Sequence, residues 1–362
     1  MTHGSCQHDK FIEPAEIERK ESVKQTEVAR RTFAVMMKIH FLFTLLMGFS
    51  ILSQIACSSE SNNDDHQGRQ NLSESKDNVL AYYSAQSAIT DAGEFVHLYE
   101  DISSEVSQIV KAVQGVIIGS DHAGALGFEL PRKRRQHEEN LRKVEDMLKC
   151  ITAMDDRALV ELRPPDKRLI GSCRHFAVLT CSLLRHKKIP ARARGGFETH
   201  HSPVRHHDHW ICEYWNPTQR RWVQVDAEMD SDLKQKWHID FDPLDLPAGT
   251  FMTGAEAWQR CRKGELNPKQ FGVGGGANEW IGGWNFVLSE LLLDLMALNK
   301  FELLPWDTNR LSEKEVSQLS ESEYALLDSV AQLINEGDNS FPEVRRLYET
   351  NSSLRMPWYW RP

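Results

Sequence analysis

The sequence has few cysteines, and none of them forms a CxxC pair. Such pairs mark structural zinc sites and thiol–disulfide exchange sites. The seven cysteines are also sparse along the 362 residues, and their odd number leaves at least one thiol unpaired. These absences exclude a small disulfide-rich scaffold, and they leave the redox compartment undecided.

An excess of positive charge is also missing. The formal net charge is −9, whereas a general nucleic-acid-binding protein needs a basic face that meets the phosphates. The one basic run, residues 132–135, is soon followed by Glu138 and Glu139, which is typical of a solvated helix face. We therefore expect no nucleic-acid partner.

The sequence contains no phosphate-binding loop. Residues 272–283 include six glycines, but they lack the preceding strand and following helix that such loops require. We interpret this segment as a loop, and we expect no cofactor.

The apolar run near the N-terminus is short. Residues 39–52 are nearly all apolar, but a membrane-spanning helix needs roughly 20 such residues. The run suits the hydrophobic part of a signal peptide. Small residues precede Cys57 and a polar stretch follows it, a layout that resembles a bacterial lipoprotein signal with Cys57 as the lipidated residue. We expect a membrane-anchored lipoprotein of the cell envelope, with an uncleaved anchor or a cytoplasmic protein as alternatives.

The pattern divides the chain into five parts. Residues 1–57 form an N-terminal extension with the signal or anchor segment, and residues 58–77, rich in Ser, Asn and Asp, form a flexible linker. Residues 78–165 are a helical section, in which an apolar stripe from Phe95 to Val113 and the segment 136–151 predict two helices. Residues 166–310 form the core, and residues 311–362 a C-terminal helical section.

The core is expected to contain a helix followed by three strands. Ser172 suits the N-cap of a helix that ends near His186. Residues 191–197, 209–215 and 221–226 are rich in β-branched and aromatic residues, which is typical of strands. A turn at Pro217 and Thr218 makes the last two strands an antiparallel hairpin.

Three residues in this core suit nucleophilic catalysis. Cys173 lies in the first turn of the helix, where unpaired N–H groups and the positive end of the dipole stabilise a thiolate. A hairpin centred on Pro217 and Thr218 places His209 directly opposite Asp226, close enough at Cβ for the carboxylate to bind one ring nitrogen. The other nitrogen is then left for Cys173, the arrangement of a nucleophile, a base and an orienting acid.

Three blocks resemble the transglutaminase-like superfamily: GSCRHFAVLTCSLLRHKKIPARARGGF, DHWICEYW and RWVQVD. The resemblance spans about residues 165–232 and implies an α+β fold with a papain-like core, in which a cysteine helix packs on an antiparallel sheet with flanking helices at both ends. It also implies that Cys173, His209 and Asp226 form the catalytic triad. The chain has no room for the extra β-domains of large animal transglutaminases, and no calcium loop is evident, so calcium-dependent crosslinking is not expected.

Neighbouring polar residues have simpler interpretations. Cys181 and Cys212 are expected in the core, and Asp208 is expected to be exposed or to cap a loop. Glu213 is predicted to pair with Arg192 or Arg194, with substrate binding as the alternative. The histidines at 200, 201, 206, 207 and 209 form a cluster. We expect a solvated loop there rather than a metal site.

These observations predict a thiol-dependent enzyme that cleaves or exchanges an amide bond through a cysteine thioester. The partner is a peptide or protein amide substrate, and a peptidase or amidase is slightly favoured over a transamidase. The alternatives are a non-catalytic binding module on the same fold and a metal-binding protein that uses the histidine loop. The oligomeric state is left open.

Overall fold

The computed structural model describes residues 78–275, 278–356 and 360. The predicted signal or anchor segment, with Cys57, and the predicted linker lie outside these residues. Among the described residues, no helix combines the length and apolar character that crossing a bilayer demands.

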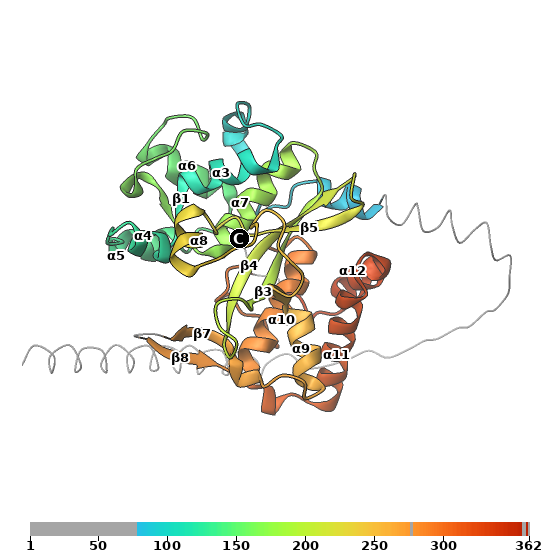
Figure 1. Cartoon of the computed structure of the whole chain (residues 1–362). Coiled ribbons are helices and arrows are strands. Elements are labelled where there is room, and N and C mark those ends of the chain that lie inside the picture. Colours follow the sequence, from blue (N-terminus) through green and yellow to red (C-terminus); the bar gives the residue numbers. More distant parts are fainter. Residues whose placement is uncertain (1–77, 276–277, 357–359, 361–362) are drawn as a thin grey trace, which may run out of the picture. The chain divides into compact units, whose positions relative to one another are not determined.

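A six-stranded sheet lies at the centre of the described fold (Figure 1). Its strands follow the order β6-β3-β4-β7-β8, and β5 pairs with β4. Every pair is antiparallel except β4 with β7, so the sheet is mixed where a purely antiparallel one was expected. The strand bounds are β3 Ala191–Glu198, β4 His206–Asn216, β5 Arg221–Val225, β6 Phe251–Thr253, β7 Phe271–Gly275 and β8 Asn278–Gly282.

Helices cover both sides of this sheet. Helix α7 packs on β3 and β4, while α10 and α9 pack on β3 from the other side (Figure 1). The α-helix bounds are α3 Val106–Val116, α4 Ser120–Ala125, α5 Arg132–Glu138, α6 Val144–Met154, α7 Cys173–His186, α8 Ser231–Trp237, α9 Gly254–Arg262, α10 Trp284–Leu298, α11 Glu321–Asn335 and α12 Phe341–Thr350. The short elements are β1 Ile117–Ile118, β2 Leu169–Ile170, and the 3-10 helices η1 Gly93–Tyr99, η2 Pro165–Lys167, η3 Pro268–Gln270, η4 Val316–Gln318 and η5 Gly337–Ser340. The protein therefore has the predicted α+β fold.

Two predicted helices are interrupted. The stripe that begins at Phe95 is divided into η1 and α3, and Ser103 Oγ accepts the backbone N–H of Glu105 at this break. Serine side chains compete with helical hydrogen bonding in this way. The segment 136–151 is divided into α5 and α6, because the N–H of Val144 donates to the carbonyl of Ile89 and starts a new helix there.

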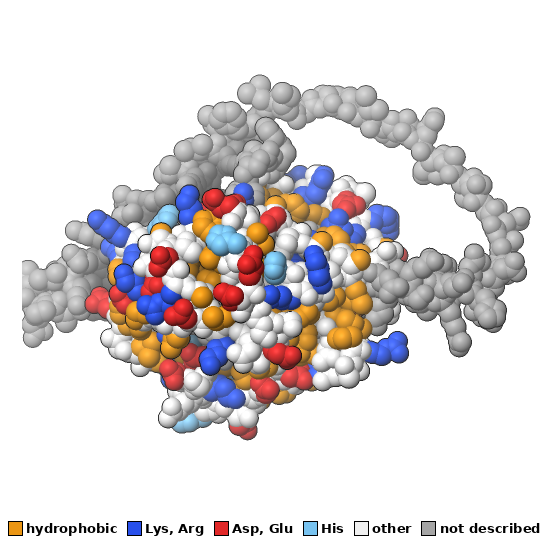
Figure 2. Space-filling view, turned by 90° about the horizontal axis from the view of Figure 1, so that it is seen from above, with side chains coloured by type: hydrophobic (Ala, Val, Ile, Leu, Met, Phe, Trp, Pro, Cys, Tyr) orange, Lys and Arg blue, Asp and Glu red, His pale blue; other side chains and the backbone are white. Residues whose placement is uncertain are grey.

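The basic run lies on α5 and is paired along the helix. Arg134 pairs with Glu138, and Arg135 with Glu139, each four residues further along the chain. Figure 2 shows acidic and basic side chains interspersed over the face that it presents. The run is a solvated helix face at Arg132, Lys133 and Arg135, whereas Arg134 is half-buried and its partner Glu138 is buried.

The glycine-rich segment 272–283 forms the β7–β8 hairpin, so its interpretation as a loop was wrong. Strand β7 pairs with β4 on one side and with β8 on the other. A Cβ at Gly272 would lie 2.1 Å from the carbonyl oxygen of Ile281. Glycine therefore allows the close approach of strands that a larger residue would prevent.

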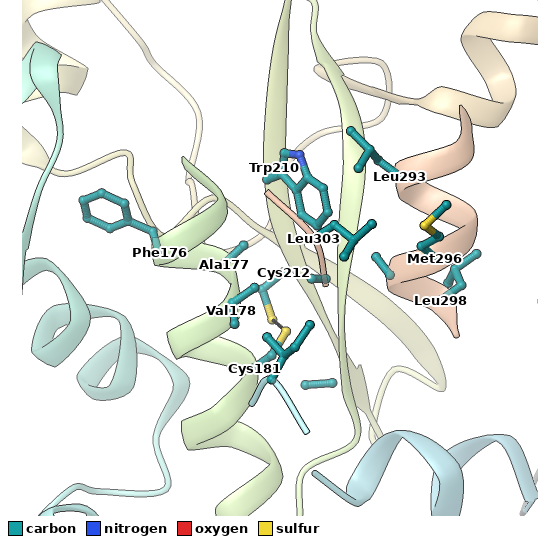
Figure 3. Close-up of a cluster of buried hydrophobic side chains, with 14 of the residues drawn as sticks. Phe176, Ala177, Val178, Cys181, Trp210, Cys212, Leu293, Met296, Leu298 and Leu303 are labelled. Carbon is teal, nitrogen blue, oxygen red and sulfur yellow. Dashed lines mark hydrogen bonds between the residues drawn. The ribbon is translucent and has the colours of Figure 1, made fainter. Parts of the chain in front are cut away.

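One hydrophobic cluster extends from Val79 to Leu354. It contains residues of the helical section, the predicted core and the C-terminal section, so these three sections share their apolar interior. Cys181 and Cys212 are buried in it as expected, with their sulfurs 3.2 Å apart (Figure 3).

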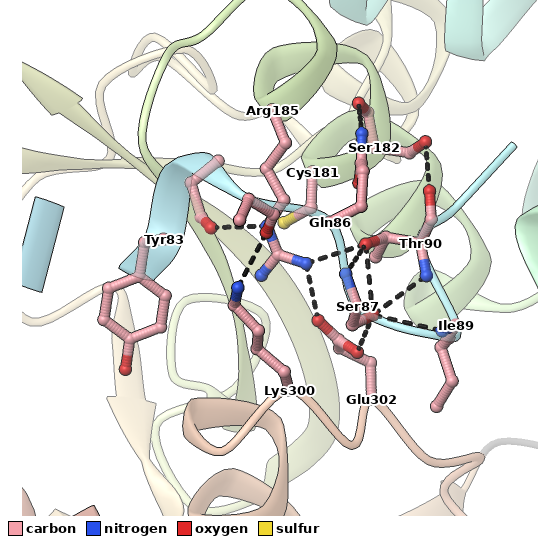
Figure 4. Close-up of polar contacts among 12 residues, drawn as sticks. Tyr83, Gln86, Ser87, Ile89, Thr90, Cys181, Ser182, Arg185, Lys300 and Glu302 are labelled. Carbon is pink, nitrogen blue, oxygen red and sulfur yellow. Dashed lines mark hydrogen bonds and ion pairs between the residues drawn. The ribbon is translucent and has the colours of Figure 1, made fainter. Parts of the chain in front are cut away.

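A buried ion pair joins α7 to the segment after α10. Arg185 Nη1 lies 2.9 Å from Glu302 Oε1, and both side chains are fully buried. Glu302 Oε2 accepts from Ser87, and Arg185 also donates to Thr90 and to the carbonyl of Ala191 (Figure 4). These bonds offset most of the cost of burying the two charges, and only Nη2 of Arg185 is left without a hydrogen-bond partner in this group.

We expect Glu302→Ala to lower the free energy of unfolding by about 3–5 kcal/mol, because it leaves the Arg185 guanidinium buried without its counter-ion. Urea-induced unfolding measures the loss. The control is Asp245→Ala, which breaks the exposed pair with Arg221 and should cost less than about 1 kcal/mol. Equal losses in the two variants would contradict this interpretation.

Candidate active site

Cys173 is the first residue of α7, and the residues around it fix this helix end. The backbone N–H of Ser172 donates to Nδ1 of His175 at 3.1 Å, as part of a capping box. A Cβ at Gly171 would lie 2.9 Å from the side chains of His175 and Ile117, so glycine is needed there. The thiol itself is half-buried, and it lies at the end of the helix where backbone N–H groups stabilise negative charge.

His209 and Asp226 meet across the sheet. His209 lies in β4, and its Nε2 is 2.9 Å from Asp226 Oδ2. Asp226 directly follows β5, and its Oδ1 accepts the backbone N–H groups of Glu228 and Met229 at 3.0 and 3.3 Å. Both carboxylate oxygens are therefore occupied, which fixes the orientation of the acid.

The predicted register of the hairpin was wrong by two residues. Strand β4 ends at Asn216 and β5 begins at Arg221, because Asn216 Oδ1 accepts two backbone N–H groups of a four-residue turn, residues 217–220. Val225 lies opposite Cys212, so Asp226 lies diagonal to His209. A shift of two residues keeps each side chain on its face, and the histidine and the acid still meet.

The structure brings the thiol to the same imidazole. The sulfur of Cys173, a ring nitrogen of His209 and a carboxylate oxygen of Glu228 all lie within 4.8 Å of one another. Since Nε2 of His209 is bonded to Asp226, Nδ1 is the nitrogen left for the thiol. Cysteine, histidine and aspartate thus have the geometry of a nucleophile, a base and an orienting acid.

The surroundings of Cys173 do not favour the thiolate that its position at a helix end led us to expect. Burial raises the pKa of the Cys173 thiol to about 11, although the hydrogen bond with His209 acts to lower it. Burial alone would lower the pKa of His209, but the charge and hydrogen bond of Asp226 raise it well above its ordinary value. The resting site therefore holds a thiol beside a strongly basic imidazole, and the helix end alone does not ionise the sulfur.

Glu228 is a site residue that the sequence did not single out. Its carboxylate raises the pKa of Cys173, and it lies so near Gly119 that a Cβ there would approach Glu228 Oε1 to 2.6 Å. Its position two residues after Asp226 was the only available signal, and this was too weak to assign it.

Asp208 is not exposed or loop-capping as expected. It lies within β4 and is partly buried. Burial raises its pKa to about 6. Its neighbour across the packing interface, Glu290 of α10, is buried, and burial followed by the charge of Asp208 raises the pKa of Glu290 well above its ordinary value.

Glu213 has two cationic partners. Its Oε2 lies 2.7 Å from Arg192 Nε and 3.1 Å from Arg194 Nη1. Although burial acts to raise the pKa of Glu213, these arginines hold it at about 2. The predicted ion pair is present with both arginines. The carboxylate is buried and paired with both arginines, so it is not free to bind a substrate.

The histidines of this loop are partly or fully buried, whereas residues 203–205 between them are exposed as predicted. His200, His201 and His207 surround Glu198, which ends β3. His206 lies apart from them, with its ring 4.9 Å from that of Phe271. Glu198 precedes the histidines in a strand, and no part of the sequence pattern marked it as their partner.

Two groups among the described residues have side chains close enough to hold a metal ion. One is Cys173, His209 and Glu228, and the other is Glu198, His200 and His201. In the first group, Asp226 already occupies a ring nitrogen of His209, as a catalytic triad requires.

Comparison with known proteins identifies the central segment. Residues 130–227 match the model of the transglutaminase-like superfamily. Among solved structures, the chain matches a proposed cysteine protease from Cytophaga hutchinsonii at 17% identity and a TM-score of 0.28, over 41% of this chain and 42% of that chain. The chain thus spans less than half the length of that protein. No curated protein matches. Residues 130–227, which include Cys173, His209 and Asp226, belong to a transglutaminase-like domain.

Proposed function

We propose that this protein is a thiol-dependent acyl-transfer enzyme that acts on an amide bond of a peptide or protein. The observation that carries the proposal is the meeting of Cys173 with one side of the His209 imidazole and of Asp226 with the other. A triad of this kind generates a nucleophile and returns a proton to the leaving group.

The chemistry proceeds in two steps. His209 takes the proton of the Cys173 thiol as the sulfur attacks the amide carbonyl, and the oxygen of the tetrahedral intermediate becomes negative. In this proposal the N–H of Cys173 at the start of α7 donates to that oxygen. His209 then gives its proton to the departing amine, and a thioester remains. Water or a second amine attacks the thioester, transfers a proton to His209, and restores the thiol.

Hydrolysis is the outcome we favour, because water reaches any exposed thioester, whereas transamidation needs an amine held beside it.

The position of Glu228 is the specific observation that favours transamidation. Its carboxylate lies within 4.8 Å of the sulfur, where it would attract a cationic amine. Peptide hydrolysis and fluorescent-amine incorporation, measured in parallel, distinguish the two. A marked fall in incorporation alone in Glu228→Gln would favour transamidation.

The first prediction from this proposal concerns the nucleophile. We expect Cys173→Ala to abolish both activities and to remove the thiol that iodoacetamide labels fastest. The matched control is Cys150→Ala, since Cys150 is also half-buried and burial also raises its pKa to about 11. Cys150→Ala should retain full activity. If both variants retain activity, or if no thiol reacts faster than the others, the domain is a non-catalytic binding module.

The second prediction concerns pH. His209 must be unprotonated to take the thiol proton, and Asp226 raises the pKa of His209, so activity should rise as pH rises through that pKa. Asp226→Asn lowers this pKa, so the ascending limb of the pH–rate profile should move to lower pH. The rate should also fall by roughly 10²–10⁴-fold. The control is Asp232→Asn, which removes an exposed carboxylate of α8. An unchanged ascending limb in Asp226→Asn would refute the orienting role.

We further propose that the apolar segment before Cys57 anchors the protein in the cell envelope, with Cys57 carrying lipid. This rests on the sequence pattern alone. Palmitate should label the full-length chain when it is produced in a bacterial host, and Cys57→Ser should lose the label. A membrane-bound chain without label would favour an uncleaved anchor, and unlabelled chain in the cytoplasm would contradict both forms of anchoring.

A further inference from the structure

A second cluster of polar side chains lies where β3 and β4 are joined. Glu198, the last residue of β3, meets His200 and His201 of the connecting loop, and His207 of β4. His207 Nδ1 lies 3.2 Å from Glu198 Oε1, and His200 Nε2 lies 3.7 Å from Glu198 Oε2. His201 Nδ1 contacts Glu198 Oε1. One acid and three imidazoles are thus concentrated around a single point.

The second ring nitrogens of His207 and His200, which do not face Glu198, indicate where each ring carries its proton. His207 Nε2 lies 3.1 Å from the carbonyl of Gly274, and His200 Nδ1 lies 3.4 Å from the carbonyl of Thr250. A carbonyl only accepts, so each of these nitrogens carries the proton. In a neutral imidazole, the second nitrogen then has a bare lone pair. Both lone pairs are directed at the Glu198 carboxylate, which is also an acceptor.

Lone pairs facing a carboxylate need a cation between them. His207 Nδ1 and His200 Nε2, the nitrogens nearest the Glu198 carboxylate, are buried without a hydrogen-bond partner. His201 instead faces Glu198 with Nδ1, and its buried Nε2 is the nitrogen without a partner. Metal-binding histidines commonly donate their other N–H to a backbone carbonyl, which fixes the ring and the tautomer. The arrangement of His200 and His207 has this form.

The spacing also fits an ion. Ligands about 2.0–2.2 Å from a tetrahedral zinc ion are separated from each other by roughly 3.4 Å. The separations of 3.2 and 3.7 Å in the cluster lie on either side of this value. The ligand atoms of Glu198, His200 and His201 lie within 4.8 Å of one another. His207 is outside that group of three and adjoins it through Glu198 Oε1.

An aromatic shell encloses the histidines. The ring of His201 is 4.2 Å from that of Trp237, that of His200 is 5.2 Å from Phe241, and that of His207 is 5.2 Å from Trp280. These aromatic residues come from α8, the loop after it, and β8. Apolar surroundings limit solvent access and strengthen ligand binding.

We propose that Glu198, His200, His201 and His207 bind one divalent transition-metal ion, with zinc as the best match to three imidazoles and one carboxylate. Four protein ligands leave no open position, which is the form of a structural site rather than a catalytic one. The ion would fix the loop between β3 and β4 to both strands. This inference does not depend on the proposed acyl transfer.

The competing occupant is a proton. At low pH an imidazolium of His207 would pair with the Glu198 carboxylate in place of the ion. Metal affinity should therefore fall as pH falls, since the ligating nitrogens must be unprotonated.

The test is a Co²⁺ titration of the full-length chain carrying Cys173→Ala, which disables the other candidate group. We expect one equivalent to bind with the intense visible bands of tetrahedral cobalt and without a thiolate charge-transfer band. His207→Ala and Glu198→Gln should each weaken binding at least about tenfold. The matched control, His137→Ala, removes an exposed histidine of α5 and should change nothing.

Circular dichroism confirms that each variant is folded. X-ray absorption of the zinc-bound Cys173→Ala chain tests the site even if the His207→Ala or Glu198→Gln variant does not fold, because it needs neither substitution. It should report three imidazoles, one oxygen and no sulfur around the zinc. Weak octahedral binding of Co²⁺, sulfur in the coordination sphere, or equal affinity in all folded variants would overturn the proposal. Iodoacetamide labelling of Cys173 in the metal-free wild-type chain tests the acyl-transfer proposal separately.

Discussion

Helix α7 packs along strands β3 and β4, and this contact sets the distance between Cys173 and His209. The helix is fixed by its own capping at Ser172 and His175, by the close approach at Gly171, and by the buried charge of Arg185 at its other end. Strand β4 brings the imidazole to the start of the helix. The turn after β4 sets the position of Asp226 beside that imidazole. The site therefore depends on the helix, the strand and the turn together.

The sequence was most informative where the local pattern and the chemistry agreed. The helix from Cys173 to His186 and the strands around His209 and Asp226 could be predicted from apolar spacing and turn residues. The register could not, because the side chain of Asn216 lengthens the turn. That error did not separate the triad, since a shift of two residues preserves the face of a strand while a shift of one would have reversed it.

Properties that arise from tertiary packing could not be predicted from the sequence. The thiol of Cys173 lies at a helix end, which favours its ionisation, but burial has the larger effect and raises its pKa. Glu198 and Glu228 are ordinary acidic residues until the fold places them beside imidazoles. Similarly, the glycines from 272 to 283 indicated a loop, and only the pairing of β7 with β4 explains why small residues are needed there.

The protein uses imidazoles in two different surroundings a short distance apart. His209 gives one nitrogen to a carboxylate, which favours the protonated ring and suits proton transfer. His200 and His207 instead give one nitrogen to a backbone carbonyl, which fixes the orientation of the ring and leaves its other nitrogen available as a ligand. The group bonded to one ring nitrogen therefore distinguishes a proton-transfer histidine from a metal-binding histidine better than the position of the residue in the sequence does.

The shared hydrophobic cluster has a consequence for any attempt to shorten the chain. Tyr99 before the matched segment contacts Ser182 of α7, and Tyr83 reaches the carbonyl of Leu298 at the end of α10. A fragment trimmed to residues 130–227 would uncover the inner surfaces of α7 and β3. It would be expected to aggregate rather than fold, so the smallest useful expression boundary encloses both flanks.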